Sequence, residues 1–208
     1  MVLITSGPTR EHIDPIRFLS NASSGAMGFA LACAARAAGA RVVVISGPTH
    51  LPPPAGVSVV RVTTALEMRR EVLKRSMRAA VVIGAAAVSD WRAPRAARHK
   101  IKRGPGAMRL TLLPNPDIIK DAAARRRSGQ IFVGFALETR RAEEHARVKL
   151  VGKGLDLIVA NGPASLASGR MRATLVGHGW TRRLPVGPKS RVARAVVGTV
   201  ERLIERGA

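Results

Sequence analysis

Residues 2–28, VLITSGPTREHIDPIRFLSNASSGAMG, decide the fold because they pass from an apolar segment through a polar loop into a helical pattern. The run VLITS is rich in β-branched residues and ends at a Gly-Pro pair, which predicts a buried strand and its exit. Prolines and polar groups predict a loop over residues 7–22. Ser23 and Ser24 follow at positions typical of helix N-caps. The order predicts a helix N-terminus close to the end of the first strand.

The alternation of strand and helix continues along the chain. An Ala-rich segment predicts a helix that ends at Gly39, and RVVVIS at 41–46 predicts a second buried strand. Further strands are expected at 57–62, 79–87, 130–136 and 155–161, and further helices at 63–78, 116–127, 140–153 and 189–206. This pattern is typical of a Rossmann-like α/β fold, with an open, mostly parallel sheet and helices on both faces. Ligands bind such sheets at the carboxyl ends of the strands.

Two segments interrupt the alternation. Residues 90–107 are basic and rich in proline and glycine, which predicts a mobile flap, and MRLTLL at 108–113 predicts a strand after it. Residues 163–187 are weakly patterned, with two short strands expected before the last helix. A length of 208 residues suits one well-buried core, so we expect a single domain over 1–208.

The net charge of +22 points to an anionic partner, which is either a nucleic acid or a small molecule. Arginines are spread through several predicted helices, so a solvated helix face explains many of them equally well. Aromatic residues make up only 3% and tyrosine is absent, which leaves few platforms for base stacking. Composition therefore favours an anionic small molecule over nucleic acid.

The sequence predicts a cytoplasmic protein. It has no apolar run as long as a membrane-spanning helix needs, and its start lacks the features of a secretory signal. The single cysteine, Cys33, fits a reducing compartment. Its Ala-rich surroundings predict a buried position on a helix, without a catalytic role.

Three features could bind a phosphorylated ligand. Residues 21–28 place backbone N–H groups at a helix N-terminus, although ordinary capping by serine explains the same pattern, and neither a GxGxxG fingerprint nor a Walker loop is present. Lys100 and Lys102 alternate along a segment that would suit a triphosphate or simply be solvated. Asp90 follows an apolar strand and could hold a metal-phosphate complex or cap a turn. The five histidines lack the spacing of metal ligands.

Taken together, the motifs resemble the phosphopantothenoylcysteine synthetase (phosphopantothenate cysteine ligase) family of coenzyme A biosynthesis. The opening block is ITSGPTREHIDPIRFLSNASSGAMGFALA, and the later blocks are ISGPTHLPPPAGVSVVRVTTALEM, AAAVSDWRAPRAARHKIKR, LTLLPNPDII, VGFALET and KGLDLIVAN. These six blocks occur in order over residues 3–161. The resemblance implies a Rossmann-like fold and a homodimer with its sites near the subunit interface, with strands that contribute to dimerisation.

The resemblance also implies a reaction. Members use CTP with Mg²⁺ to convert 4′-phosphopantothenate to an acyl-cytidylate, and cysteine then attacks it and CMP leaves. Some relatives use ATP instead. Many bacterial members are fused to a flavin-dependent decarboxylase. Because this chain begins with Met1 on its first strand, we expect a separate decarboxylase, if any, and no flavin here.

Roles for individual residues follow from the resemblance. Asn21 would hold the acyl-cytidylate carbonyl, Lys100 would contact the triphosphate and act in the second step, and Arg17 would contact phosphopantothenate. The residues expected to bind nucleotide are Ser23, Ser24, Gly25, Met27, Ala86, Ala87, Asp90, Lys100 and Phe135. Asp90 would also hold the metal together with the triphosphate.

The sequence departs from the family pattern at three places. Ala26 replaces the lysine usual in the SSGKMG segment, Asn161-Gly162 replaces an Asn-Asp pair, and the segment after it, PASLASGRMRATL, lacks the usual motif. Besides a nucleic-acid-binding module, one other alternative is an NAD(P) oxidoreductase. The missing GxGxxG and the absence of tyrosine disfavour it.

Overall fold

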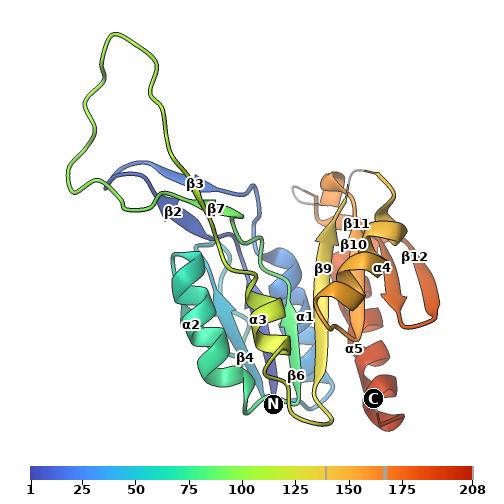
Figure 1. The fold of residues 1–208 in the computed structure, drawn as a ribbon. Helices are drawn as coiled ribbons and strands as arrows, with labels where there is room; N and C mark the ends of the chain where they lie inside the picture. Colours follow the sequence, from blue (N-terminus) through green and yellow to red (C-terminus); the bar gives the residue numbers. More distant parts are fainter. Residues whose placement is uncertain (139, 166–167, 208) are drawn as a thin grey trace.

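The computed structural model describes residues 1–138, 140–165 and 168–207, and a central sheet organises them. The strands of this sheet are β1 (Val2–Ser6), β4 (Val42–Ser46), β5 (Ser58–Arg61), β6 (Val81–Gly84), β9 (Ile131–Leu137), β10 (Leu157–Asn161), β11 (Arg170–Gly177) and β12 (Trp180–Pro188). Their order is β12-β11-β10-β9-β6-β1-β4-β5 (Figure 1). Six strands from β5 to β10 run parallel, whereas β11 and β12 extend the sheet antiparallel. The predicted open, mostly parallel α/β sheet is confirmed.

Helices cover both faces of the sheet. They are α1 (Ala26–Ala37), α2 (Ala65–Ser76), α3 (Ile118–Ala123), α4 (Ala142–Gly152) and α5 (Lys189–Glu205). Buried residues of α1 and α5 pack with Ile4 on one face, and those of α2, α3 and α4 pack with Leu3 on the other. Because successive side chains of a strand point to opposite faces, β1 contributes to both halves of the core.

The direction of winding reverses at β1. From β1 the chain continues to β4 and β5 on one side, and it then returns to β6 on the other side of β1. Beyond the paired strands, Pro8 and Ala87 form an isolated parallel bridge, and the Ala87 N–H donates to the Gly7 carbonyl at 2.9 Å. Doubly wound sheets bind ligands at such a reversal, so the end of β1 and β6 is where a site is expected.

Two small hairpins stand at this carboxyl end. β2 (Arg10–His12) pairs with β3 (Phe18–Ser20), and β7 (Trp91–Arg92) pairs with β8 (Leu113–Pro114). The β2–β3 hairpin lies within the predicted loop 7–22. Its strands have only three residues each and are partly polar, so no alternating apolar pattern indicates them in the sequence. In Figure 1 both hairpins and the long loop between β7 and β8 lie at the edge opposite the two termini.

The loop predicted as a flap is longer than expected. Residues 93–112 contain no helix or strand, so the prediction of a strand at 108–113 is wrong except for Leu113. The side chains of Met108 and Leu110 are 50% and 39% exposed. An alternating pattern does not form a strand where no partner strand lies beside it, because the backbone N–H and C=O groups then gain nothing over hydration.

The structure differs from two smaller predictions, the burial of Cys33 and the helix over 116–127. Cys33 is exposed on α1, so its predicted burial is wrong; the buried positions of this helix include Leu31, Ala32 and Ala35. The helix predicted at 116–127 is shortened to α3 at both ends; it starts later because Asp117 is its cap and accepts from the Lys120 N–H at 3.1 Å, and it ends at the C-cap residue Ala124. Residues 166 and 167 of the weakly patterned segment lie outside the described residues. In the part of the chain that the structure describes, no helix has the length and apolar character to cross a membrane.

Gly28 allows α1 to approach β1 closely. A Cβ atom built on Gly28 would lie 2.4 Å from the Ser6 Oγ and 2.5 Å from the Ser6 Cβ. We expect Gly28→Ala to lower the free energy of unfolding by about 1–3 kcal/mol, as is usual when a packed contact is overfilled. Thermal and denaturant unfolding measure this.

Gly198→Ala in α5 is the matched control for that substitution, since its added methyl group would meet only side-chain atoms 3.8 Å or more away. An alanine in a helix interior is favoured over glycine, so this control should unfold at the same or a higher temperature. Equal destabilisation by both variants would contradict the close contact at Gly28.

Candidate functional site

Two neighbouring cavities lie at the carboxyl ends of β1, β6 and β9, and we call them the small and the large cavity. The small cavity has a volume of about 130 Å³ and is lined by Ser23–Gly28, by Asn161 and Ser165 and by Lys189, among others. The large cavity has a volume of about 680 Å³ and is lined by Asn21, Asp90, Asn115, Asp117, Lys149 and Lys153, among others. Ala86, Ala87, Phe135 and Leu137 line both. These four residues therefore form a shared wall.

The N-terminus of α1 opens on the small cavity. The helix is capped by Gly25, which has a left-handed backbone (φ 79°), and its cap makes no side-chain hydrogen bond. The prediction that Ser23 and Ser24 cap this helix is therefore wrong. Instead, the Ser6 hydroxyl donates to the Gly25 carbonyl at 2.9 Å and fixes the turn. The Ala26 N–H, the first of α1, donates to the Ser24 hydroxyl at 3.4 Å, whereas the Gly25 cap offers no side-chain acceptor to the Met27 and Gly28 N–H groups, which is a favourable environment for an anion.

A cation lies on the same cavity. Lys189 stands at the start of α5, and burial lowers the pKa of its amine below the usual value. No pattern in the sequence pointed to this residue, because only the packing of α5 beside α1 brings it to the cavity. Ala26 lines the cavity too. The cavity therefore has a lysine in its lining, although position 26, where the resemblance implies a lysine, is alanine.

Asn21 is the first residue of the loop after β3, and its side chain contacts the loop after β6. Its Nδ2 donates to the Ala87 carbonyl at 3.2 Å and to the Val88 carbonyl at 3.0 Å. An asparagine amide has two N–H donors, and both are used here. A substrate carbonyl could accept from this amide only in exchange for one of these bonds. The side chain is exposed at the large cavity, where such an exchange has room.

Asp90 is exposed and lines the large cavity, and its backbone carbonyl accepts from the Asn115 N–H at 2.7 Å. Within the described residues, no group of three or more His, Cys, Asp or Glu side chains could hold a metal ion by itself. A lone carboxylate facing a cavity does fit Mg²⁺ that is bound mainly through substrate phosphates and water. Asp90 therefore suits a metal that arrives with a nucleotide.

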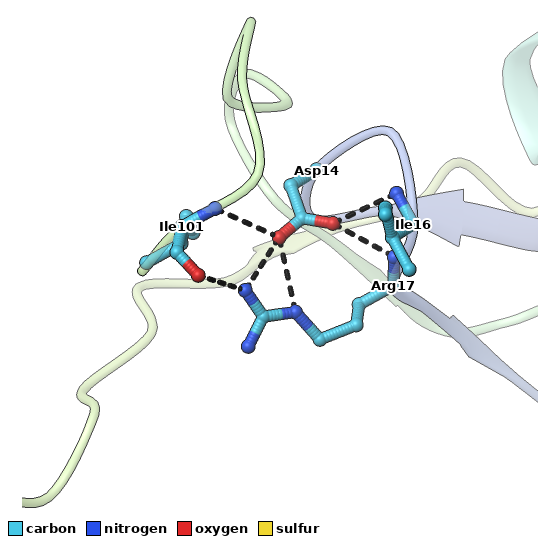
Figure 2. A network of polar contacts seen from close by, with 4 residues as sticks. All are labelled: Asp14, Ile16, Arg17 and Ile101. Carbon is cyan, nitrogen blue, oxygen red and sulfur yellow. Dashed lines mark hydrogen bonds and ion pairs between the residues drawn. The ribbon is translucent and has the colours of Figure 1, made fainter. Parts of the chain in front are cut away.

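Lys100 and Arg17 line neither cavity. Lys100 is exposed on the flap, and Arg17 stands in the turn of the β2–β3 hairpin. As Figure 2 shows, the Arg17 guanidinium bonds Asp14 and the Ile101 carbonyl, next to Lys100 in sequence. The Arg17 side chain keeps 41% of its surface exposed. Arg17 thus holds the flap at the residue after Lys100, apart from the cavities that the other predicted site residues line.

Four polar residues of the large cavity were not singled out from the sequence. Asn115 donates from its Nδ2 to the Ser89 carbonyl at 2.8 Å, and Lys153 pairs with Asp117 at 2.8 Å. Lys149 pairs with Glu138 at 2.6 Å. The blocks LLPNPD and KLVGKG contain these residues, and two lysines four residues apart at the end of the predicted helix 140–153 were an available signal.

Glu138 directly follows β9 and contacts Lys149, which lines the large cavity. Its carboxylate lies 2.6 Å from the Lys149 amine and 2.9 Å from the His145 ring nitrogen. Burial raises the pKa of this carboxyl, but the hydrogen bonds from Lys149 and His145 outweigh that effect and leave the pKa below its usual value. Glu138 therefore stays ionised at neutral pH and keeps Lys149 beside the cavity.

The far wall of the small cavity uses the segment that departs from the family pattern. Asn161 at the end of β10 bonds the Ser165 hydroxyl through its Nδ2, and Ser165 donates to the Gly162 carbonyl at 2.7 Å. Pro163–Ser165 form a single 3-10 turn. A compact polar turn thus closes the cavity although the usual motif is missing there.

Residues 1–203 match the family described as the DNA/pantothenate metabolism flavoprotein C-terminal domain. The chain belongs to this family. The predicted resemblance is thereby confirmed, since the family includes the C-terminal part of coenzyme A biosynthesis bifunctional proteins.

Relatives within this family match nearly the whole chain. The coenzyme A biosynthesis bifunctional protein CoaBC of Vibrio cholerae is 43% identical over 202 residues, which are 94% of this chain and 51% of the relative. The chain thus spans about half the length of this relative. A crystal structure of the C-terminal domain of a CoaBC protein is 36% identical, with a TM-score of 0.85, and the match covers 99% of this chain and 95% of that one.

A more distant structure of similar fold is that of a Cab2 mutant in complex with phosphopantothenate-cysteine. It has a TM-score of 0.83 at 18% identity and covers 99% of this chain and 87% of that one. This likeness concerns the fold alone. The Vibrio relative is named as bifunctional, so a second activity shares its polypeptide, in contrast to the separate partner that we expected from the sequence.

Proposed function

We propose that the chain is a phosphopantothenate cysteine ligase that uses CTP. The observation that carries the proposal is the pair of cavities with a shared wall, because segments far apart in the sequence meet there within a fold of the coenzyme A biosynthesis family. The Cab2 complex, in which a protein of this fold binds phosphopantothenate-cysteine, supports the same substrate class.

In the proposed first step, a carboxylate oxygen of 4′-phosphopantothenate attacks the α-phosphorus of CTP. A P–O bond forms to give the acyl-cytidylate, and the bond to the β-phosphate breaks and releases pyrophosphate. In the second step, the amine of cysteine attacks the acyl carbon, an amide forms, CMP leaves and the amine loses a proton. No atom changes oxidation state, so the reaction does not require a flavin.

Positioning and charge stabilisation would carry this chemistry. Both substrates are polyanions, and the small cavity offers the N-terminus of α1 and Lys189, so we assign phosphates to it. The large cavity has the volume for the base and ribose, beside Phe135 and Lys149. Asn21 would stabilise the acyl carbonyl, in the manner of an oxyanion-hole donor. Bound Mg²⁺ would neutralise phosphate charge where the triphosphate extends into the large cavity, and Asp90 would hold it there together with the triphosphate.

The assembly and its surroundings are part of the proposal. A homodimer would place Arg17 of one subunit near the phosphopantothenate of the other. An exposed side chain on β12, Val186 (45% exposed), and the free edge of that strand suit contact with a second copy. We propose the cytoplasm as the compartment, and a phosphopantothenoylcysteine decarboxylase as the activity that consumes the product.

Pyrophosphate release tests the function. The protein is incubated with phosphopantothenate and Mg²⁺ and with CTP, ATP, GTP or UTP in turn, with and without cysteine. We expect pyrophosphate with CTP only, and CMP release and product only when cysteine is added. Turnover with ATP instead would mean that the protein is a ligase whose nucleotide is ATP and not CTP.

Binding to nucleic acid separates the ligase from the competing function. A basic nucleic-acid-binding module would bind duplex or single strands with an affinity that falls steeply and log-linearly with salt. Such binding, together with no pyrophosphate from any nucleotide, would overturn the ligase proposal.

A further inference from the structure

A fully buried carboxylate anchors the middle of the flap at Ile101. Asp14, in the turn between β2 and β3, has no exposed surface. Its Oδ1 accepts from the backbone N–H groups of Ile16 at 2.9 Å and Arg17 at 2.8 Å, which shapes the turn. Its Oδ2 accepts from the Arg17 guanidinium, at 3.0 Å from Nε and 2.6 Å from Nη2. One carboxylate oxygen thus shapes the β2–β3 turn, and the other binds the Arg17 side chain.

The carboxylate also binds a second segment, the flap. The same Oδ2 of Asp14 accepts from the Ile101 N–H at 3.2 Å, and the Arg17 Nη2 donates to the Ile101 carbonyl at 2.7 Å (Figure 2). Both backbone groups of Ile101 are therefore bound by one ion pair. A further bond joins the Ala97 N–H to the Ile13 carbonyl at 2.8 Å. Lys100 lies between these two attachment points, next to the one made by the ion pair.

The ion pair is suited to a permanent contact. The hydrogen bond from the Arg17 side chain, against the opposing effect of burial, holds the pKa of the Asp14 carboxyl well below its usual range. The carboxylate is therefore charged throughout the physiological pH range. Hydrogen bonds to a charged group are stronger than those between neutral groups, so Ile101 is held more firmly than an ordinary loop residue.

We propose that Asp14 and Arg17 form a latch that positions Lys100 through the backbone of Ile101. Asp14 is then a positioning residue, since it contacts the flap and not the substrates, and Arg17 has this role in addition to any contact with phosphopantothenate. The inference rests on the proposed function, because Lys100 matters only if the flap takes part in the ligase reaction.

Asp14→Asn should disrupt the bonds of the latch while keeping those that shape the β2–β3 turn. The new amide oxygen can keep the bonds to the Ile16 and Arg17 N–H groups, while its NH₂ group would face the guanidinium and the Ile101 N–H, which are all donors. We expect hydrogen exchange at the Ile101 amide to become at least about tenfold faster, as for the loss of a hydrogen bond to a charged group. We also expect faster tryptic cleavage at the basic residues 98–103.

Activity provides the second measurement. With phosphopantothenate, CTP and Mg²⁺, Asp14→Asn should form pyrophosphate at a rate close to that of the wild type and form the amide product several-fold more slowly. Arg17→Lys keeps the positive charge but loses the forked geometry, so it should accelerate exchange at Ile101 in the same direction. This second variant keeps the test valid if Asp14→Asn fails to fold.

The control is Gly28→Ala, which should lower stability without loosening the flap. Exchange at Ile101 that stays at the wild-type rate in both latch variants would overturn the latch. Because exchange and proteolysis need no substrate, they report on the latch even if no nucleotide is turned over. An absence of pyrophosphate from the wild type would overturn the ligase function separately.

Discussion

Asn21→Asp is expected to lower the rate of pyrophosphate release about 100-fold or more. In the wild type, the Asn21 amide donates to the carbonyls of Ala87 and Val88. An aspartate would turn these attractions into repulsions and would add negative charge where two polyanionic substrates must meet. Loss of a single donor of the oxyanion-hole type commonly costs a factor of 10² to 10³ in turnover. Initial rates with saturating CTP and phosphopantothenate measure this effect.

Asn115→Asp is the matched control for Asn21→Asp. Asn115 lines the same cavity, and its amide also donates to a backbone carbonyl, that of Ser89. Its Oδ1 accepts from Arg92 at 3.2 Å, so a carboxylate at this position would retain a cationic partner. We expect a loss of about tenfold or less there. Equal losses at the two positions would mean that Asn21 only shapes the loop.

Lys100→Gln is expected to slow the second half-reaction about 10- to 100-fold while pyrophosphate formation continues. Lys100 is exposed on the flap, and we propose that its cation reaches the reacting phosphate when cysteine attacks. Removing the charge should therefore let the acyl-cytidylate accumulate. Rapid quenching, followed by separate quantification of pyrophosphate, CMP and amide product, distinguishes the two steps.

Lys102→Gln tests whether the effect is specific to position 100. Lys102 is exposed on the same flap, on the other side of the anchored Ile101. A general loss of positive charge would affect both variants alike, and its effect would fall as salt is added. We expect Lys102→Gln to keep most of the second-step rate; a full rate in Lys100→Gln itself would remove Lys100 from the mechanism.

The parallel sheet could be predicted from the sequence because buried parallel strands are continuous apolar runs. RVVVIS and QIFVGFA have this property, and β4 and β9 lie within one residue of the predicted ends. Prediction failed for segments whose sequence pattern is not set by burial in the core. Residues 108–112 of the alternating MRLTLL form no strand, and the turn between β2 and β3 is shaped by the Asp14 side chain, whose bonds to the Ile16 and Arg17 N–H groups leave no strand-like periodicity in the sequence.

The site was predictable only where a motif marked it. The structure brings Asn21, the segment 23–27, the two alanines of the wall, Asp90 and Phe135 together around the two cavities. Lys189 could not be found in this way, since a lysine at the start of a helix is common and only the tertiary packing of α5 aims it at the cavity. Cys33 shows the opposite error, because an Ala-rich helix has no strongly marked polar face from which exposure could be read.

The wall that includes Ala86 and Ala87 limits how the proposed ligase could be re-engineered. Both residues border the two compartments, and they form the shared wall together with the Phe135 and Leu137 side chains. A larger side chain introduced there to alter the choice of nucleotide would take volume from at least one compartment. Selectivity for the base is therefore easier to change at the outer lining, near Asn115 and Lys153, where each residue borders a single compartment.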